Sequence, residues 1–274
     1  MPIERGTLKK FTHPSSFLAP VRRRESIYEL FHENTKLTRL TARFSQIAVQ
    51  TFLSSRNIRE VLNRAFKVYS LADRVELERP EPRNSLENVI AARRSARRFT
   101  GESATIEELS RLLFFSYGKV QQGDYPLRMV ASGGALYPLE IYVVALRVEG
   151  LDPGIYHYNI EDHGLEVLER CDGLEMVKER ILVREIDVDN AAMVLLITGV
   201  FRRNTIKYLD RGYRMILFEA GEVAHNMNLM ATSIGLGGCL VGGFYDDELS
   251  AALGIDGIDE APLLPLVLGR PVRD

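Results

Sequence analysis

The chain has 274 residues and a formal net charge of −2, so a general affinity for nucleic acid is not expected. Hydrophobic residues make up 46% of the chain, which is ordinary for a globular protein, and two cysteines are too few for a disulfide framework or a paired-cysteine metal site. The first residues lack an apolar signal region, and no apolar run reaches the length of a membrane helix. We therefore expect a cytoplasmic protein with no membrane segment and no metal site.

The N-terminal part of the chain predicts a helical extension. Residues 1–23 contain prolines and an arginine run and are expected to be irregular. Apolar residues recur at helical spacing between residues 25 and 72. Residues 78–83 then combine two prolines with charged side chains, which is typical of a boundary. The sequence thus predicts an extension over residues 1–80 and a main domain over residues 81–274.

The first half of the main domain mixes helices and strands. Residues 105–108 form a capping-box pattern, which predicts the start of a helix. Residues 121–126 are expected to be a loop. Residues 141–146 and 191–200 are continuous apolar runs, typical of strands that are covered on both faces.

The second half continues this mixture. Residues 154–168 predict a hairpin, and residues 212–234 predict one long helix. This helix is apolar on more than one side and is therefore expected to be buried, either centrally or in a subunit interface. Residues 236–244 and 263–268 predict further strands, and Pro265 favours an edge position or a strand start. Because helices and strands lack a regular βαβ alternation, the pattern favours an α+β fold over a doubly wound sheet.

An arginine cluster follows the first helix of the main domain. Arg93, Arg94, Ser95 and Arg97 combine planar guanidinium donors with a hydroxyl, a set that can hold a phosphate or a polyol chain. The alternative is a solvated basic helix end, which the helix dipole favours. The cluster alone leaves both interpretations open.

A glycine pair stands shortly before the first apolar strand. In the segment of Ser132, Gly133, Gly134 and Ala135, the missing Cβ atoms let the backbone approach a flat or anionic group closely. The alternative is an ordinary turn before a strand. The segment is therefore a candidate ligand contact.

A second glycine pair, Gly242 and Gly243, closes a glycine-rich segment that begins at residue 235. This segment superficially resembles a dinucleotide-binding loop. Its glycines follow a helix and open a strand, which is the wrong order for a Rossmann turn. A Rossmann-type nucleotide site is therefore not predicted.

Lys207 and Tyr208 stand between the buried strand and the long helix. A tyrosine beside a lysine can have its phenolate stabilised, which makes it a candidate proton acceptor. The alternative is a surface turn. Glu222 and His225 lie one helical turn apart but lack the second pair that a di-iron bundle needs, so we interpret them as structural or interface residues.

These motifs resemble those of a known family. The pattern from Arg93 to Arg97 resembles the arginine–serine–arginine signature that opens FMN-dependent nitroreductase domains. Residues 132–140, Ser-Gly-Gly-Ala-Leu-Tyr-Pro-Leu-Glu, resemble the azoline oxidase branch, the SagB- and McbC-type dehydrogenases of peptide-toxin and peptide-antibiotic biosynthesis. Further matches to that branch are Lys207-Tyr208, Gly242-Gly243, Arg270 and, before the domain, the helical motif of residues 31–37.

The resemblance implies a nitroreductase-like α+β fold, with a central and mainly antiparallel sheet flanked by helices. It also implies an intertwined homodimer with two FMN molecules at the interface. The implied activity is the oxidation of thiazoline or oxazoline rings to thiazoles or oxazoles in ribosomal peptide natural-product biosynthesis. The implied partners are an azoline-containing peptide and cyclodehydratase subunits, and a carrier-tethered substrate is an open variant.

Two alternatives to this activity stay open. One is an NAD(P)H-dependent reductase of nitro compounds or quinones. The other is a non-catalytic scaffold subunit of a cyclodehydratase complex. Steady NAD(P)H consumption would select the first, and a protein that lacks flavin but holds its partners would select the second.

The resemblance also assigns roles to residues. Lys207 and Tyr208 would be the catalytic pair. One departure is Ala131, where the family commonly has proline, and this affects the expected rigidity of the loop. The implied FMN contacts are Arg93, Ser95 and Arg97 at the phosphate and ribityl groups with Arg270 assisting, Ser132, Gly133 and Ala135 at the ring from the partner subunit, Gly242 and Gly243 on the ring's other side, and Arg94 and Gly134 within the same motifs.

Overall fold

The computed structural model describes residues 26–56, 66–67, 69, 71–122, 125–181 and 185–272. The irregular stretch expected over residues 1–23 lies outside these described residues. Within them, none of the helices combines the length and the apolar character that crossing a membrane requires.

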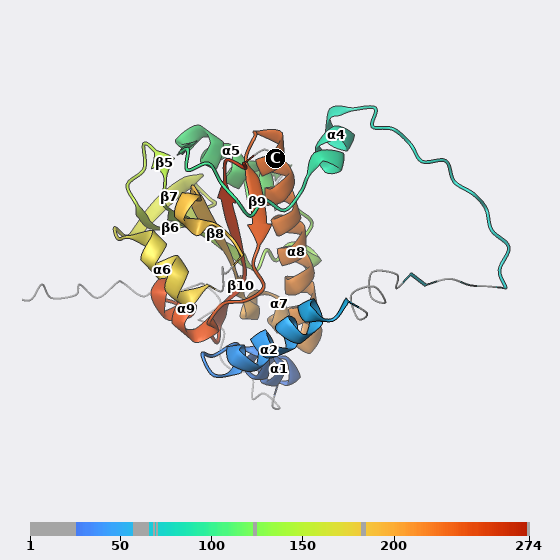
Figure 1. Cartoon of the computed structure of the whole chain (residues 1–274). Coiled ribbons are helices and arrows are strands. Elements are labelled where there is room, and N and C mark those ends of the chain that lie inside the picture. Colours follow the sequence, from blue (N-terminus) through green and yellow to red (C-terminus); the bar gives the residue numbers. More distant parts are fainter. Residues whose placement is uncertain are drawn as a thin grey trace, which may run out of the picture.

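A six-stranded sheet forms the centre of the main domain (Figure 1). The strands are β4 (Leu139–Ala145), β6 (Gly154–Asn159), β7 (Gly164–Glu169), β8 (Met193–Val200), β9 (Gly237–Leu240) and β10 (Glu260–Gly269). Their order in the sheet is β7-β6-β4-β8-β10-β9, and every neighbouring pair is antiparallel. The expected mainly antiparallel sheet is thus confirmed.

Helices cover both faces of this sheet. The helices α5 (Ile106–Tyr117) and α8 (Asp210–Ser233) pack on one face, and α6 (Gly173–Arg180) and α9 (Asp246–Leu253) pack on the other. Every residue of β8 is buried, and its side chains point alternately into the two cores. This double coverage explains why the sequence of the strand is continuously apolar.

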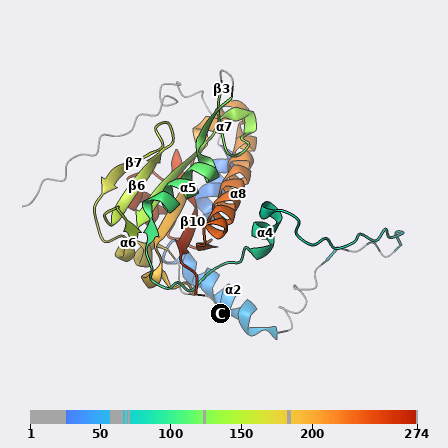
Figure 2. The ribbon, with the colours of Figure 1, turned by 90° about the horizontal axis from the view of Figure 1, so that it is seen from above.

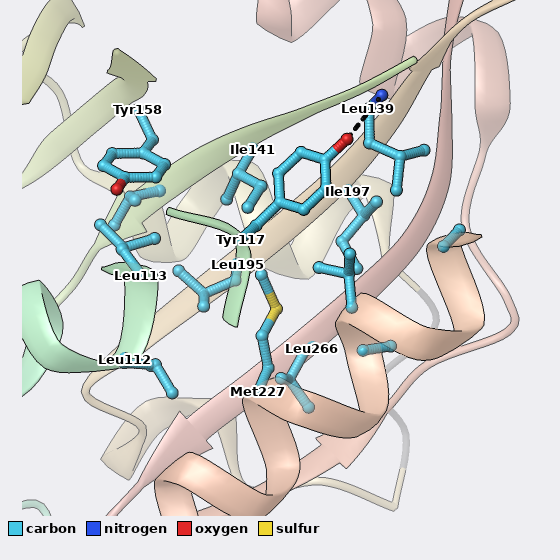
Figure 3. Close-up of a cluster of buried hydrophobic side chains, with 14 of the residues drawn as sticks. Leu112, Leu113, Tyr117, Leu139, Ile141, Tyr158, Leu195, Ile197, Met227 and Leu266 are labelled. Atoms are coloured by element: carbon cyan, nitrogen blue, oxygen red, sulfur yellow. Dashed lines mark hydrogen bonds between the residues drawn. The ribbon is translucent and has the colours of Figure 1, made fainter. Parts of the chain in front are cut away.

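The core on the α8 side also contains a polar anchor (Figure 3). Leu195 and Ile197 of β8 meet Met227 of α8 there. The ring of Tyr117 lies in the same cluster, and its hydroxyl accepts a hydrogen bond of 3.3 Å from the backbone N–H of Leu139. The last residue of α5 is therefore fixed to the first residue of β4.

The remaining elements surround this body. The capping box predicted at residues 105–108 is confirmed at the start of α5. Figures 1 and 2 show α4 and the segment before it projecting away from the sheet. The elements are α1 (Ile27–Thr35), α2 (Thr41–Ser54), α4 (Ser85–Ala92), α7 (Phe201–Tyr208), the paired short strands β1 (Ala104–Thr105) and β5 (Val148–Glu149), and the 3-10 turns η2 (Gly133–Ala135) and η3 (Val188–Asn190).

Two local expectations are wrong. A loop is expected over residues 121–126, but the described residues there belong to two paired antiparallel strands, β2 (Lys119–Gln122) and β3 (Tyr125–Arg128). Strand β10 lies between β8 and β9, so Pro265 is neither in an edge strand nor at a strand start. The carbonyl of Pro265 accepts a hydrogen bond of 2.9 Å from the N–H of Val241, which follows the last residue of β9. In an antiparallel pair the N–H and C=O of a residue point to the same side, so the N–H that Pro265 lacks would also face this point, where the pairing with β9 ends.

Candidate active site

The pairing of β4 with β8 brings two motifs to the same end of the sheet. Leu139, at the start of β4, pairs with Gly199, near the end of β8. The loop that precedes β4 and the helix α7 that follows β8 therefore start from neighbouring points. These two segments carry the glycine pair of residues 133–134 and the pair of Lys207 and Tyr208.

Gly134 lies directly against both members of the Lys207–Tyr208 pair. Its φ of +70° falls in the left-handed region that favours glycine. A Cβ atom placed on Gly134 would lie 2.5 Å from Oη of Tyr208 and 2.7 Å from Nζ of Lys207. Two motifs that are far apart in the sequence thus form one cluster.

Lys207 and Tyr208 end α7 immediately before a sharp change in direction. Leu209 has φ +49° and ψ −142° and separates α7 from α8. Such a backbone costs a non-glycine residue about 1–3 kcal/mol and persists only where its surroundings hold it. The Nζ of Lys207, which is exposed, lies 5.1 Å from the ring centroid of Tyr208.

A buried carboxylate holds the glycine loop from inside. Glu219 of α8 is 2% exposed and accepts hydrogen bonds from the hydroxyls of Ser132 at 2.5 Å and Tyr117 at 2.7 Å. The Ser132 oxygen in turn accepts from the N–H of Tyr137 at 2.9 Å. Burial raises the pKa of Glu219, although both hydroxyl donors oppose this effect. The Ser132 side chain is thus engaged in fixing its own loop.

The loop needs such an anchor because its backbone is strained. Ala135 and Tyr137 carry side chains but have positive φ values of +54° and +46°, and the neighbouring Gly134 has a positive φ as well. The guanidinium of Arg128 lies 4.5 Å and 5.1 Å from the ring centroids of Tyr117 and Tyr137 and so links this loop to the end of α5. Glu219 and Arg128 were not expected as site residues; the available signal for Glu219 was its place among the apolar residues Ile216, Ala220 and Val223 on one face of the helix.

A second network ties the loop to α7. Arg203 donates to the carbonyl oxygen of Tyr137 at 3.1 Å and forms an ion pair with Glu140. The Nε2 atom of His157 lies 3.1 Å from the other oxygen of Glu140. Burial raises the pKa of Glu140, but the hydrogen bonds and charges of His157 and Arg203 outweigh it and bring the pKa to about 2. The helix that carries the Lys207–Tyr208 pair is therefore fixed to the loop through a charged carboxylate.

The contact between His157 and Glu140 should make stability depend on pH. Burial lowers the pKa of His157, but its hydrogen bonds with Glu140 and Glu166 raise it overall above 6.5. A raised histidine pKa adds stability that is complete below pH 6.5 and is lost as the pH rises through the folded-state value. The lowered pKa of Glu140 adds stability above pH 4.5 that is lost as the pH falls toward about 2.

We therefore expect His157→Gln to lower the free energy of unfolding by about 1–3 kcal/mol near pH 5.5 and by less near pH 8.5. Urea unfolding at the two pH values measures this difference. A double-mutant cycle with Glu140→Gln isolates the pair. A coupling energy that is equal at both pH values would contradict the assignment.

The arginine cluster lies beside β9. Arg93 is the C-terminal cap residue of α4, and Ser95 forms a parallel bridge with Gly238. Burial raises the pKa of the Cys239 thiol, and the charge of Arg97 opposes this, which places Arg97 beside the same strand. The cluster thus runs along the free edge of β9 within the described sheet.

Arg270 and Arg94 differ in their surroundings. The Nη2 atom of Arg270 donates to Glu108 at 2.7 Å, and its Nη1 lies 3.7 Å from where a Cβ on Gly235 would be. The Nη1 of Arg94 instead donates to two carbonyl oxygens at the end of α4, each at 2.8 Å. Arg270 therefore lies with the residues beside β9, whereas Arg94 forms hydrogen bonds at the C-terminal end of its own helix, α4.

Gly242 and Gly243 follow the C-terminal end of β9, which is at Leu240. Nothing lies within 4 Å of where a Cβ on Gly242 would be, so this backbone is open. The helix α8 has 24 residues and spans about 36 Å from the Tyr208 turn to the neighbourhood of Arg270. The glycine loop thus lies along the first half of α8, against Met215 and Glu219, whereas Arg270 lies near the other end of this helix.

Known proteins match this chain over most of its length. The model of the Nitroreductase family matches residues 90–270. "Putative nitroreductase MJ1384" of Methanocaldococcus jannaschii is 38% identical over 205 residues, which cover 74% of this chain and 100% of that protein. Microcin B17-processing protein McbC of Escherichia coli is 28% identical over 169 residues, 60% of this chain and 62% of McbC. A chain of the solved E. coli microcin synthetase McbBCD complex with truncated pro-MccB17 bound has a TM-score of 0.63 at 22% identity, over 89% of this chain and 97% of that chain.

The chain belongs to the nitroreductase family, a family of oxidoreductases. The similarity to McbC confirms the resemblance to the SagB- and McbC-type proteins within it. The expected nitroreductase-like α+β fold is confirmed as well. The chain spans 62% of McbC, so the processing activity in that protein's name is not by itself the activity of this chain.

Proposed function

We propose that this protein is an FMN-dependent azoline oxidase, which converts thiazoline or oxazoline rings in a peptide to thiazoles or oxazoles. The observation that carries the proposal is the approach of Gly134 to Nζ of Lys207 and Oη of Tyr208. It joins in one cluster the two motifs that resemble this branch of the family. The similarity to McbC, a microcin B17-processing protein, supports a peptide substrate.

The donors beside β9 fit the phosphate of FMN. Arg93, Arg97 and Arg270 offer guanidinium groups, and Ser95 offers a hydroxyl, which are groups suited to a phosphate and a polyol chain. The glycine loop lets the side chains of Lys207 and Tyr208 lie directly against the backbone of Gly134, and the flat ring of the flavin would lie beside this cluster. Gly242 and Gly243 would lie on the other side of the ring.

These two groups of residues support a homodimer. In one chain the glycine loop contacts Glu219, and the arginine cluster lies beyond Ser233 at the end of α8, so about 21 Å of helix separates the two groups. We infer that each FMN contacts the arginine cluster of one protomer and the glycine loop of its partner.

The McbBCD complex contains a bound peptide, and we propose that partner subunits contribute to peptide recognition here too.

The reaction removes a proton from Cα and a hydride from Cβ of the azoline ring. Bound FMN supplies the acceptor for the hydride, with dioxygen as the final oxidant. Oη of Tyr208 or Nζ of Lys207 accepts the proton. Gly134 makes room for both atoms at the loop because it carries no side chain.

The test begins with the absorbance spectrum of the purified protein and the mass of its released chromophore. A synthetic azoline peptide then measures azole formation. We expect Lys207→Ala and Tyr208→Phe each to lower the rate by about 100-fold or more. Bound FMN should stay unchanged, because neither residue belongs to the arginine cluster.

The matched control is Lys178→Ala. Lys178 lies on α6, which packs on the opposite face of the sheet, and its partner is the exposed Asp189. This variant should keep the full rate. Full azole formation by both pair variants with FMN bound would show the proposal to be wrong.

A second candidate is an NAD(P)H-dependent reductase. It is favoured by the 38% identity with a protein named as a putative nitroreductase. Steady NAD(P)H consumption with a nitro or quinone acceptor, and no azole product, would select it. A protein that binds no FMN but holds its partner subunits would select a scaffold instead.

A further inference from the structure

The helix α1 is fastened to the turn that follows the Lys207–Tyr208 pair. Asp210, the first residue of α8, accepts a hydrogen bond of 2.8 Å from the hydroxyl of Ser26. The same oxygen accepts one of 3.3 Å from the backbone N–H of Tyr28. A carboxylate at this position satisfies N–H groups at the start of a helix and interacts favourably with its dipole.

Aromatic packing strengthens this attachment on both sides of the turn. The rings of Tyr28 and Tyr213 stack with centroids 5.6 Å apart, and His32 lies 4.8 Å from the ring of Phe201. The Nδ1 of His32 lies 3.2 Å from the hydroxyl of Tyr213. Tyr28 and His32 are both only 6% exposed. One short helix therefore contacts the first residue of α7 and the first turn of α8.

The other end of the motif at residues 31–37 is fastened to the neighbourhood of α9. Lys36 donates to the carbonyl oxygen of Gly257 at 2.9 Å and to Asp247 at 3.1 Å. The N–H of Leu37 donates to Asp246 at 2.8 Å, and the N–H of Asp246 donates back to the carbonyl of Leu37 at 3.2 Å. The motif is thus held at both ends, which keeps α1 in one place.

The turn itself needs external support. Leu209 has a backbone conformation that is rare for a side-chain-bearing residue, and its side chain is 74% exposed, so it contributes little packing of its own. The contacts of α1 reach Phe201 before it and Asp210 and Tyr213 after it. These contacts fix the two helices whose junction carries Tyr208.

We propose that α1 is a positioning element for the catalytic turn, and that Asp210 is the positioning residue that links them. This inference rests on the function proposed for Lys207 and Tyr208. It gives the motif at residues 31–37 a role: the motif holds α1 so that Oη of Tyr208 and Nζ of Lys207 stay at the glycine loop.

The test compares Asp210→Ala with Asp210→Asn. Alanine removes both hydrogen bonds, whereas the asparagine oxygen can still accept them. We expect alanine to lower kcat for azole formation about tenfold with KM and bound FMN unchanged, because only the reacting groups are displaced. Asparagine should restore most of the rate. Loss of FMN together with an unchanged kcat per bound flavin would show a merely structural role and overturn the proposal.

Hydrogen exchange gives a readout that needs neither substrate nor cofactor. The N–H groups of Leu209 and Gly212 donate at 2.9 Å to Thr205 and Leu209, on either side of the turn. In Asp210→Ala these two amides should exchange about tenfold faster, while those of β8 stay as in the parent protein. Unchanged exchange at both amides would overturn the proposal.

Two further variants keep the result interpretable. Arg39→Ala breaks an ion pair with Glu248 next to the motif but away from the turn, so it should leave exchange and kcat unchanged. If Asp210→Ala does not fold, Tyr213→Phe removes only the contact with His32 and should still speed exchange at the two amides about threefold. Faster exchange in a protein without oxidase activity would uphold the positioning role and refute the proposed function. Full oxidase activity with unchanged exchange would do the reverse.

Discussion

Replacing Gly134 with alanine is expected to lower the rate of azole formation by about 100-fold or more while the protein stays folded. The new Cβ would lie 2.5 Å from Oη of Tyr208 and 2.7 Å from Nζ of Lys207. Both atoms are the far ends of side chains, so the clash is relieved by moving the two groups that take part in the reaction. The left-handed φ of +70° adds a cost of about 1–2 kcal/mol. Azole formation per bound FMN and urea unfolding measure the two effects.

Gly164→Ala is the matched control for this prediction. Gly164 lies in β7 with no atom within 4 Å of where a Cβ would be, so activity and stability should hardly change. In a Tyr208→Phe background the atom at 2.5 Å is absent, and Gly134→Ala should then cost less stability than in the parent protein. A Gly134→Ala protein with the full rate would show that the placement of Lys207 and Tyr208 at the loop is not required.

The buried strands could be predicted because protein covers both of their faces. The long helix could be predicted from the helical spacing of its apolar residues, although its expected burial is incomplete, since Leu217 and Phe218 are exposed. All residues of β8 are buried between two cores, so its apolar run has no polar face to confuse the pattern. The helix expected over residues 212–234 is α8 and begins two residues earlier, at Asp210. The pair of strands β2 and β3 was missed because its residues are mostly polar and include Pro126, which argues against a strand outside an edge.

Neighbours in the sheet could not be predicted from local patterns. Gly134 meets Lys207 and Tyr208 because the start of β4 pairs with the end of β8. Nothing in an apolar run says which other run will pair with it. The sequence therefore indicates the glycine loop and the Lys207–Tyr208 pair as two separate motifs, and only the fold brings them into contact.

The role of Glu219 was hidden for a related reason. Its partners, Ser132 and Tyr117, come from a distant loop and from α5, so no spacing within α8 indicates them. The hydrogen bond with Glu219 also differs from the role expected for Ser132. Its hydroxyl, expected at the flavin ring, is directed to a buried carboxylate, while the backbone of its loop faces the Lys207–Tyr208 pair.

Glu219→Ala is expected to lower the free energy of unfolding by about 2–5 kcal/mol and to remove azole formation. The substitution leaves the hydroxyls of Tyr117 and Ser132 without their acceptor in the core, at about 1–3 kcal/mol each, and opens a cavity. The strained loop also loses its anchor, so Gly134 no longer stays at the Lys207–Tyr208 pair. Urea unfolding and the rate per bound FMN measure both losses.

Glu222→Ala removes an exposed carboxylate from the same helix and should change stability by no more than about 0.5 kcal/mol. Glu219→Gln keeps the size of the side chain and one acceptor, so we expect a loss of only about 1–2 kcal/mol. Combining Glu219→Ala with Ser132→Ala should cost less than the sum of the two, because both remove the same hydrogen bond. Additive losses would mean that the carboxylate and the loop are energetically independent, and that the loop is held by Arg128 and Arg203 instead.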